Sequence, residues 1–390
     1  MTVHAASHTW YETPLRDLRI QRFDVLDSWR GIAACMVALF HLEVNSHIDN
    51  LSFIRNSWLF VDFFFVLSGF VIAANYQRRL LDGFGFWRFV LLRFGRLYPL
   101  HLFVLAVFLG LKAIQAQVPV LSSVARNQPF SLRDSPVAIA ANLLLIQGMG
   151  VLDFLSFNIP SWSVSTEFWA YIAFGTSLVL LRNSARSLLV AVVVLAPIFL
   201  YDKVGHIDTT YDYGFVRCIF GFSLGALSWA FFNRFKARRL GTTIEVATVA
   251  CVIYFVSASG RTGITLIAPF VFAVTVLVFA CESGRISAAL SQPAFLKIGE
   301  LSYSIYMLHF LVAGRFTDVA RLLRHFGFHT LVQTRQGELI GLETWQGDLL
   351  TIVYLAVVIV GAGLTFRFVE EPSRRWFRGL AAERAVQPAA

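Results

Sequence analysis

Charged residues are scarce in this chain of 390 residues: they make up 15% of it, whereas 57% of the residues are hydrophobic. Soluble domains carry about 25% charged residues on average. The shortage excludes an ordinary soluble protein of this size, because several apolar runs are long enough to cross a membrane. We therefore predict an all-α fold, a polytopic integral membrane helical bundle.

Cysteine is equally scarce. The four cysteines (Cys35, Cys218, Cys251 and Cys281) all fall inside apolar segments, without a close Cys or Cys/His pairing. This argues against disulfides and against a zinc site, so we assign no metal-ligating residue. The first 28 residues lack the apolar core of a cleavable signal peptide. The net charge is +9, but the basic residues cluster in short loops, which favours a role in membrane orientation over nucleic-acid binding.

The apolar segments define the expected topology. About ten of them are predicted to span the membrane, near residues 29–44, 58–76, 97–116, 164–181, 187–201, 214–232, 243–257, 264–281, 301–320 and 349–368. A shorter apolar piece at 138–150 is expected to be re-entrant or interfacial. Residues 1–23 and 376–390 are expected to be cytoplasmic tails, and 24–375 one membrane domain.

The predicted orientation of the chain in the membrane depends on the shorter apolar piece at 138–150. If it crossed the membrane fully, the basic loop at 182–186 would face outside. If it does not cross, most loop Lys and Arg residues lie on one side, as the positive-inside rule requires. We therefore expect both termini to be cytoplasmic.

The first apolar segment, LDSWRGIAACMVALFH, contains one arginine and one histidine. Arg30 and His41 are eleven positions apart, or roughly three helical turns, so they share a helix face about 16 Å apart along the axis. Arg30 is expected at one membrane boundary and His41 slightly past the midplane. The plain interpretation is a snorkelling arginine and a structural histidine. We favour a path for a long anionic ligand, since ionisable groups inside a span are usually functional.

The second segment, FVDFFFVLSGF, carries Asp62 near its outer end. An interfacial acid facing water and a functional acid explain it equally well. Ser68 and Gly69 are expected to serve close helix packing. A basic cluster follows, with Arg88, Arg93 and Arg96 on the inner side. These residues help to set the orientation of the chain in the membrane, and they could also bind phosphate groups.

Two later motifs contain further candidates. In PSWSVSTEFWAY, Glu167 lies within an apolar run, so we expect it to be protonated, paired or hydrated, with Arg217 or a histidine as possible partner. In IGELSYSIYMLHF, His309 lies in a span; a lone histidine there is usually structural. His101 is interpreted as structural.

Together these motifs resemble the membrane acyltransferase-3 superfamily, over roughly residues 24–375 and in the family's order. LDSWRGIAACMVALFH resembles its Arg-(ten residues)-His signature, VDFFFVLSGF its second-span motif and FWRFVLLRFGRLYP its basic loop. WSVSTE resembles its Trp-Ser…Glu motif, and IGELSYSIYMLHF and FVEEPSRRW its closing segments. Phe60 departs from the common glycine, and Phe168-Trp169 replace more polar residues.

The resemblance implies transfer of an acyl group, usually acetyl, from cytoplasmic acyl-CoA to a hydroxyl of a cell-surface carbohydrate or its lipid-linked precursor, in a bacterial inner membrane. The family's essential pair maps to Arg30 and His41. Acyl-CoA, the carbohydrate or glycolipid acceptor and the lipid bilayer are the expected partners, and no metal is required.

We assign roles to the candidate residues accordingly. The CoA phosphates are held by Arg30, Arg88, Arg93 and Arg96, and His41 is the general base. Glu167 or Asp62 orients His41 or the acceptor, and the acceptor contacts Trp162, Ser163 and His309. The alternatives are a lipid or small-molecule acceptor, a transporter of an anionic solute, which the lack of inverted repeats disfavours, and a purely structural membrane partner.

Overall fold

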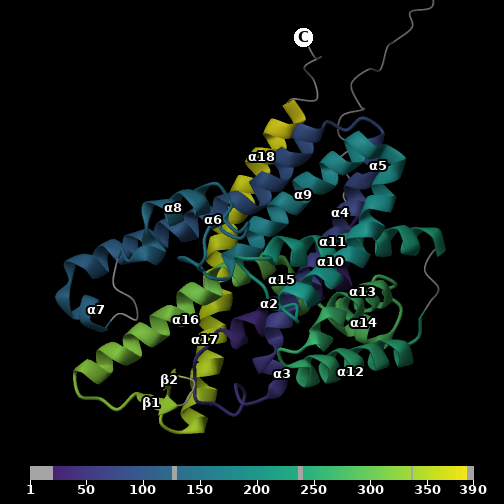
Figure 1. Cartoon of the computed structure of the whole chain (residues 1–390). Helices are drawn as coiled ribbons and strands as arrows, with labels where there is room; N and C mark the ends of the chain where they lie inside the picture. The colour runs from purple at the N-terminus through teal and green to yellow at the C-terminus, as the bar shows by residue number, and fades with distance from the viewer. Residues whose placement is uncertain (1–20, 125–129, 236–239, 335–336, 384–390) are drawn as a thin grey trace, which may run out of the picture.

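The computed structural model describes residues 21–124, 130–235, 240–334 and 337–383. Within them the chain is almost entirely helical, which confirms the all-α prediction (Figure 1). Of the expected tails at 1–23 and 376–390, residues 1–20 and 384–390 lie outside the described residues, and residues 376–383 are helical. The principal helices before the middle of the chain are α2 (Asp24–Phe40), α4 (Phe60–Ile72), α5 (Arg78–Leu81), α6 (Phe86–Gln117), α8 (Pro136–Leu143), α9 (Ser161–Leu181) and α10 (Ala185–Lys203).

The second half continues the bundle with long helices joined by short ones. Its elements are α11 (Gly214–Phe235), α12 (Thr242–Ser259), α13 (Ala268–Phe279), α14 (Arg285–Leu290), α15 (Pro293–Glu300), α16 (Ser302–His325), α17 (Thr344–Thr365) and α18 (Glu371–Glu383). Short helices α3 (Ser52–Arg55) and α7 (Pro119–Val124) lie in connections, as do the 3₁₀ turns at Ser57–Leu59, Leu132–Asp134, Arg182–Ser184 and Gly263–Ile267.

Each of the ten expected spans contains a helix, although the first is helical only to Phe40. By length and composition, seven described helices could cross a membrane, over residues 57–81, 86–117, 161–181, 185–203, 214–235, 242–259 and 344–382. The helix at 263–279 is apolar but shorter. Helices α2 and α16 lie where the sequence predicts spans, but they are not among these seven. Helix α2 has only 17 residues. The chain is thus a polytopic membrane protein.

The first helix ends earlier than the sequence suggests. The expectation that it continues to Val44 is wrong, because α2 ends at Phe40 and His41 closes its last turn. The chain then extends, and Val44 forms a parallel bridge with Ile340. Ile340 ends a small antiparallel hairpin of β1 (Leu331–Thr334) and β2 (Gly337–Ile340). His41 therefore lies at the end of a helix and not within a longer span.

The ambiguous apolar piece does not cross the membrane. Helix α8 has eight residues, whereas about 20 are needed to span the hydrocarbon core. Pro136 occupies its first turn, and the Ser135 hydroxyl accepts a hydrogen bond from the Ala138 amide at 3.3 Å. Its Asn142 carbonyl lies 3.0 Å from Nε2 of His101. The helix is thus fixed against α6, and His101 has the structural contact expected of it.

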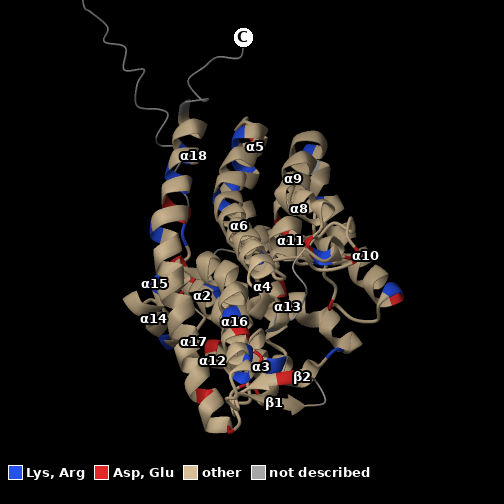
Figure 2. Cartoon of the chain, turned by 90° about the vertical axis from the view of Figure 1, so that its left-hand side faces the viewer, with Lys and Arg blue, Asp and Glu red and all other residues tan. Residues whose placement is uncertain are grey.

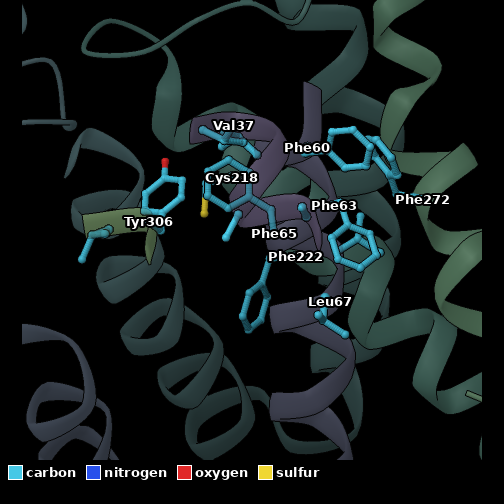
Figure 3. Close-up of a cluster of buried hydrophobic side chains, with 14 of the residues drawn as sticks. Val37, Phe60, Phe63, Phe65, Leu67, Cys218, Phe222, Phe272 and Tyr306 are labelled. Atoms are coloured by element: carbon cyan, nitrogen blue, oxygen red, sulfur yellow. The ribbon is translucent and has the colours of Figure 1, made fainter. Parts of the chain in front are cut away.

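Helix α4 lies at the centre of the bundle. Its phenylalanines pack among α2, α11 and α13, as Figure 3 shows for Phe60, Phe63 and Phe65. Helices α4 and α11 approach most closely through glycine: a Cβ at Gly69 would lie 1.9 Å from the Phe222 carbonyl oxygen, and one at Gly225 1.9 Å from that of Val66. Close approach of this kind requires residues without a side chain, so the packing role predicted for Gly69 is consistent with the structure.

The C-terminal region forms one continuous column. Helices α17 and α18 are joined by a π-helical segment at Phe366–Glu370, and the resulting helix runs the length of the molecule (Figure 1). Its last part packs on α6, where Phe377 fills the space beside Gly95. The expected domain boundary at residue 375 therefore falls inside a packed helix. Lys and Arg gather at the end of the bundle marked by α18 and α5 in Figure 2.

Candidate active site

Arg30 joins α2 to the junction of α15 and α16. Its Nε donates to the Ser302 hydroxyl at 2.7 Å and its Nη2 to the Gly299 carbonyl at 3.2 Å. Nη1 lies 3.0 Å from the Asp27 carboxylate. The helices can approach because Gly31 and Gly299 face each other's backbones. One guanidinium thus fixes three chain segments at the edge of an internal cavity.

This cavity has a volume of about 1120 Å³ and contains most of the predicted anion-binding groups. Arg30, Arg93 and Arg96 line it together with Glu167 and Ser163. Arg88 does not line it; its guanidinium lies over the Phe84 ring, 4.6 Å from the centroid. The sequence reasoning missed further basic residues of the lining, namely Arg22, Arg79, Lys297, Arg374, Arg375 and Arg378. Two of them, Arg374 and Arg375, lie in the motif FVEEPSRRW, which was the feature of the sequence that could have identified them as cavity residues.

The basic groups of the cavity differ in how far they are already neutralised. Lys297 pairs with Glu300 at 2.7 Å, and Arg375 with Glu371 at 2.8 Å. Arg93 donates to the Tyr76 hydroxyl at 2.9 Å. Arg96 makes no ion pair or hydrogen bond with any residue that the structure describes, although carboxylates lie further off across the cavity. Arg96 is therefore free to bind an incoming anion.

Glu167 is held by two hydroxyl groups. The Ser68 hydroxyl donates to its carboxylate at 2.6 Å, and the Tyr171 hydroxyl donates to the same oxygen. Ser68, expected to serve packing alone, thus has a polar partner and lines the cavity. Tyr171, one turn after Glu167, was missed by the sequence reasoning. These contacts orient a carboxylate in the same cavity as Arg96.

Asp62 lies outside the cavity and pairs with Arg217, the residue that the sequence considered as a partner for Glu167. The two oxygens of Asp62 accept from Nε and Nη2 of Arg217 at 2.9 and 2.7 Å. Both side chains are buried, with exposures of 0% and 1%. The guanidinium also lies between the rings of Trp58 and Trp162, 5.2 and 5.5 Å from their centroids. Asp62 therefore positions Trp162 through Arg217 and has no contact with Glu167.

His41 is also outside the cavity lining. Its Nδ1 lies 2.9 Å from the Val37 carbonyl oxygen and 3.3 Å from Nε2 of His309, which is fully buried. Neither Glu167 nor Asp62 is hydrogen-bonded to His41. The pairing with His309 joins two residues that the sequence singled out separately.

Tyr306 connects the histidine pair to the cavity. It lines the cavity, and its hydroxyl forms a 2.7 Å hydrogen bond with the Ser163 hydroxyl. Its ring centroid is 5.5 Å from that of His309, which in turn is 4.9 Å from that of His41. Tyr306 lies one helical turn before His309 in the motif SYSIYMLHF, so the spacing could have revealed it. A continuous line of side chains thus leads from Ser163 to His41.

Comparisons with known proteins show which family the chain resembles. A family model described as an acyltransferase domain matches residues 23–367. "Acyltransferase MdmB" of Streptomyces mycarofaciens is 26% identical over 392 aligned positions, covering 92% of this chain and 93% of that protein. "Protein 2 in picA locus" of Rhizobium radiobacter is 43% identical over 90 residues, 22% of this chain and 44% of that protein. No solved structure matches.

Among the described residues, no group of three or more His, Cys, Asp or Glu side chains is arranged to hold a metal ion. The family match covers Arg30, Arg93 and Arg96 of the cavity, Glu167 and both histidines, whereas Arg22, Arg374, Arg375 and Arg378 lie outside it. The chain therefore belongs to the acyltransferase-3 family of multi-pass membrane acyltransferases.

Proposed function

We propose that the protein transfers an acyl group, with acetyl the expected one, from acyl-CoA to a hydroxyl of a surface or exported carbohydrate. The observation that carries this proposal is the large cavity in which Arg96 lies without an ion-pair partner among the described residues, beside Arg30 and Arg93. Arginine suits phosphate groups because its planar fork binds them in a bidentate manner. The cavity volume slightly exceeds the about 300–1,000 Å³ usual for small-molecule sites, as a ligand of the size of CoA requires.

The donor enters with its phosphates among the cavity arginines and its thioester near Ser163 and Tyr306. The basic end of the bundle faces the cytoplasm in this proposal, because loops rich in Lys and Arg stay on that side. Both termini are then cytoplasmic, and the inner membrane of a bacterium is the proposed location. Charged phosphates thereby remain at the boundary, where they avoid the cost of burial in the bilayer.

His41 acts as the general base. Because the Val37 carbonyl only accepts, Nδ1 of His41 carries the hydrogen, and Nε2 retains a lone pair. Nε2 takes the proton of the acceptor hydroxyl while the hydroxyl oxygen attacks the thioester carbonyl. The carbon–sulfur bond then breaks, and the CoA thiolate leaves and takes up that proton. Glu167 and Ser163 orient the reacting end of the donor, and Trp162 contacts the acceptor.

A donor assay tests the anion site. With labelled acetyl-CoA, Arg96→Ala is expected to raise the KM for the donor, since an unpaired guanidinium in the cavity is lost. Arg88→Ala is the matched control: the same residue type in the same helix, α6, but outside the cavity lining. Equal effects of the two substitutions would refute the assignment of the cavity to the donor.

The catalytic role is tested separately. His41→Ala should lower transfer about 10²–10⁴-fold, the usual contribution of a general base, with unchanged membrane abundance. Retained transfer would remove His41 from the mechanism. If purified protein released no CoA and transferred no label with any carbohydrate, lipid or small-molecule hydroxyl, acyl-CoA would be the wrong donor.

A further inference from the structure

Two histidines from different helices meet where α2 ends. His309 lies on α16, fully buried, and its Nε2 is 3.3 Å from Nδ1 of His41. His41 itself is only partly buried. Because His309 has no exposed surface, whereas His41 is partly exposed, His309 is badly placed to touch a substrate.

The hydrogen-bond partners determine which nitrogen atoms carry protons. Nδ1 of His41 must carry a hydrogen, since the Val37 carbonyl can only accept. Nε2 of His309 must then present a lone pair to that N–H, so the hydrogen of the neutral His309 ring is on Nδ1. This Nδ1 is buried and has no hydrogen-bond partner among the described residues. Acceptors on the second ring nitrogen commonly set the tautomer of a working histidine.

A tyrosine fixes the geometry of the pair. The Tyr354 hydroxyl of α17, fully buried, lies 3.0 Å from the Ala38 carbonyl and 3.1 Å from the His309 carbonyl. A single hydroxyl thus bridges the backbones of α2 and α16 beside both histidines. The rings of Phe40 and Phe310 contact His41 edge to face, 4.8 and 5.7 Å between centroids. The imidazole of His41 is therefore confined on several sides.

We infer that His309 is a positioning residue for His41 and not a substrate contact. Its Nε2 lone pair shares Nδ1–H of His41 with the Val37 carbonyl. The two acceptors together keep the proton off Nε2 of His41 and direct that atom toward the acceptor hydroxyl. When His41 takes up the acceptor proton, the same bond stabilises the imidazolium. This inference rests on the proposed role of His41 as base, and it replaces the acceptor contact predicted for His309 from the sequence.

Two substitutions of similar size separate these roles. In His309→Gln, the side-chain oxygen can occupy the place of Nε2 and accept the same hydrogen bond. In His309→Leu, only the Val37 carbonyl remains as an acceptor for Nδ1–H of His41. We expect His309→Leu to lower kcat about 10–100-fold, by analogy with the range found for hydrogen-bond partners of metal-bound histidines, with the KM of both substrates within about twofold. His309→Gln should restore most of the loss.

The opposite pattern would overturn the inference. A raised acceptor KM with unchanged kcat in His309→Leu would make His309 a substrate contact. Equal losses in the Gln and Leu variants would exclude the acceptor role. Tyr354→Phe, which removes only the bridging hydroxyl, should also lower kcat without changing either KM.

A double variant separates this inference from the role of His41. In a His41→Ala background, His309→Leu should cause no further loss of the residual transfer, because His309 acts through His41. A further loss would show an independent role. If His41→Ala alone kept full activity, the proposed base would fail, which is a different result.

A spectroscopic measurement needs no variant that folds poorly. Nitrogen-15 spectra of histidine-labelled protein in membranes, with His41 assigned by its absence in His41→Ala, should show neutral His41 protonated at Nδ1. A proton on Nε2 would overturn the inference.

Discussion

The ion pair between Asp62 and Arg217 allows a quantitative prediction. Both side chains are almost fully buried, and two hydrogen bonds join them. Removing one partner of a buried pair costs about 3–5 kcal/mol, because the other charge stays buried without compensation. Replacing both by apolar residues of similar volume is often neutral. We therefore expect Asp62→Leu and Arg217→Met each to destabilise the protein, and the double variant to recover most of the loss.

The expected change is large enough to measure. With an unfolding entropy of about 2.1 cal/mol/K per residue, a loss of about 3–5 kcal/mol in a chain of 390 residues lowers Tm by about 4–6 °C. A thiol-reactive fluorescent maleimide reports unfolding if Cys218 is kept as the only cysteine, since Cys218 is 0% exposed in the fold. Single variants as stable as the parent, or a double variant no better than either, would refute the reasoning.

The same double variant tests how Asp62 contributes to function. If the carboxylate acts only by holding Arg217 against Trp162, a stable double variant should keep measurable acyl transfer. Complete loss of transfer at normal stability would instead place the Asp62 carboxylate in the chemistry.

Three further predictions follow from other contacts. Gly225→Ala should force α4 and α11 apart by about 1 Å and lower Tm, because its Cβ would lie 1.9 Å from the Val66 carbonyl oxygen. Gly110→Ala is the control: its Cβ would have no atom within 4 Å, so this substitution should not destabilise the protein. Equal Tm values for the two variants would contradict the packing. Single cysteines at Ser123 and Ser184, both exposed, should react differently with an impermeant thiol reagent in sealed cells, and equal labelling would reject the ten-span topology. The hydrogen bond from Arg324 lowers the pKa of Glu338 in the hairpin below its ordinary 4.5. The contribution of Glu338 to stability is therefore complete above about pH 4.5 and is lost as pH falls through the folded-state pKa. Glu338→Gln should flatten the acid side of the Tm–pH curve, and an unchanged curve would show that another group causes the loss of stability in acid.

The helical fold could be predicted because hydrophobic length is a property of each segment by itself. The same holds for Arg30, Arg93 and Arg96, whose charges are evident without any tertiary contact. The end of α2 at Phe40 could not be predicted, because the extended segment that follows it is held by the bridge between Val44 and Ile340, which joins residues almost 300 positions apart.

Side-chain pairing was the least predictable part. Glu167 was recognised as a costly buried acid, whereas for Asp62 a water-facing acid and a functional acid remained equally open. The sequence does not say which partner each one has. Arg217 stands 155 positions from Asp62, and the Ser68 and Tyr171 hydroxyls that bind Glu167 are chemically ordinary. Their roles depend on how α4, α9 and α11 are packed, which only the structure shows.

The continuous helix from α17 to α18 has a consequence for the surrounding lipid. Its 39 residues at 344–382 extend about 60 Å, twice the thickness of a roughly 30 Å hydrocarbon core, so part of it must leave the hydrocarbon. Helices bend where a π-helical turn interrupts them, and here that turn supplies Phe366 and Glu370 to the cavity lining. A change in bilayer thickness is accommodated by tilting or bending. Such a bend would fall beside the cavity and would move Arg374, Arg375 and Arg378 relative to α6.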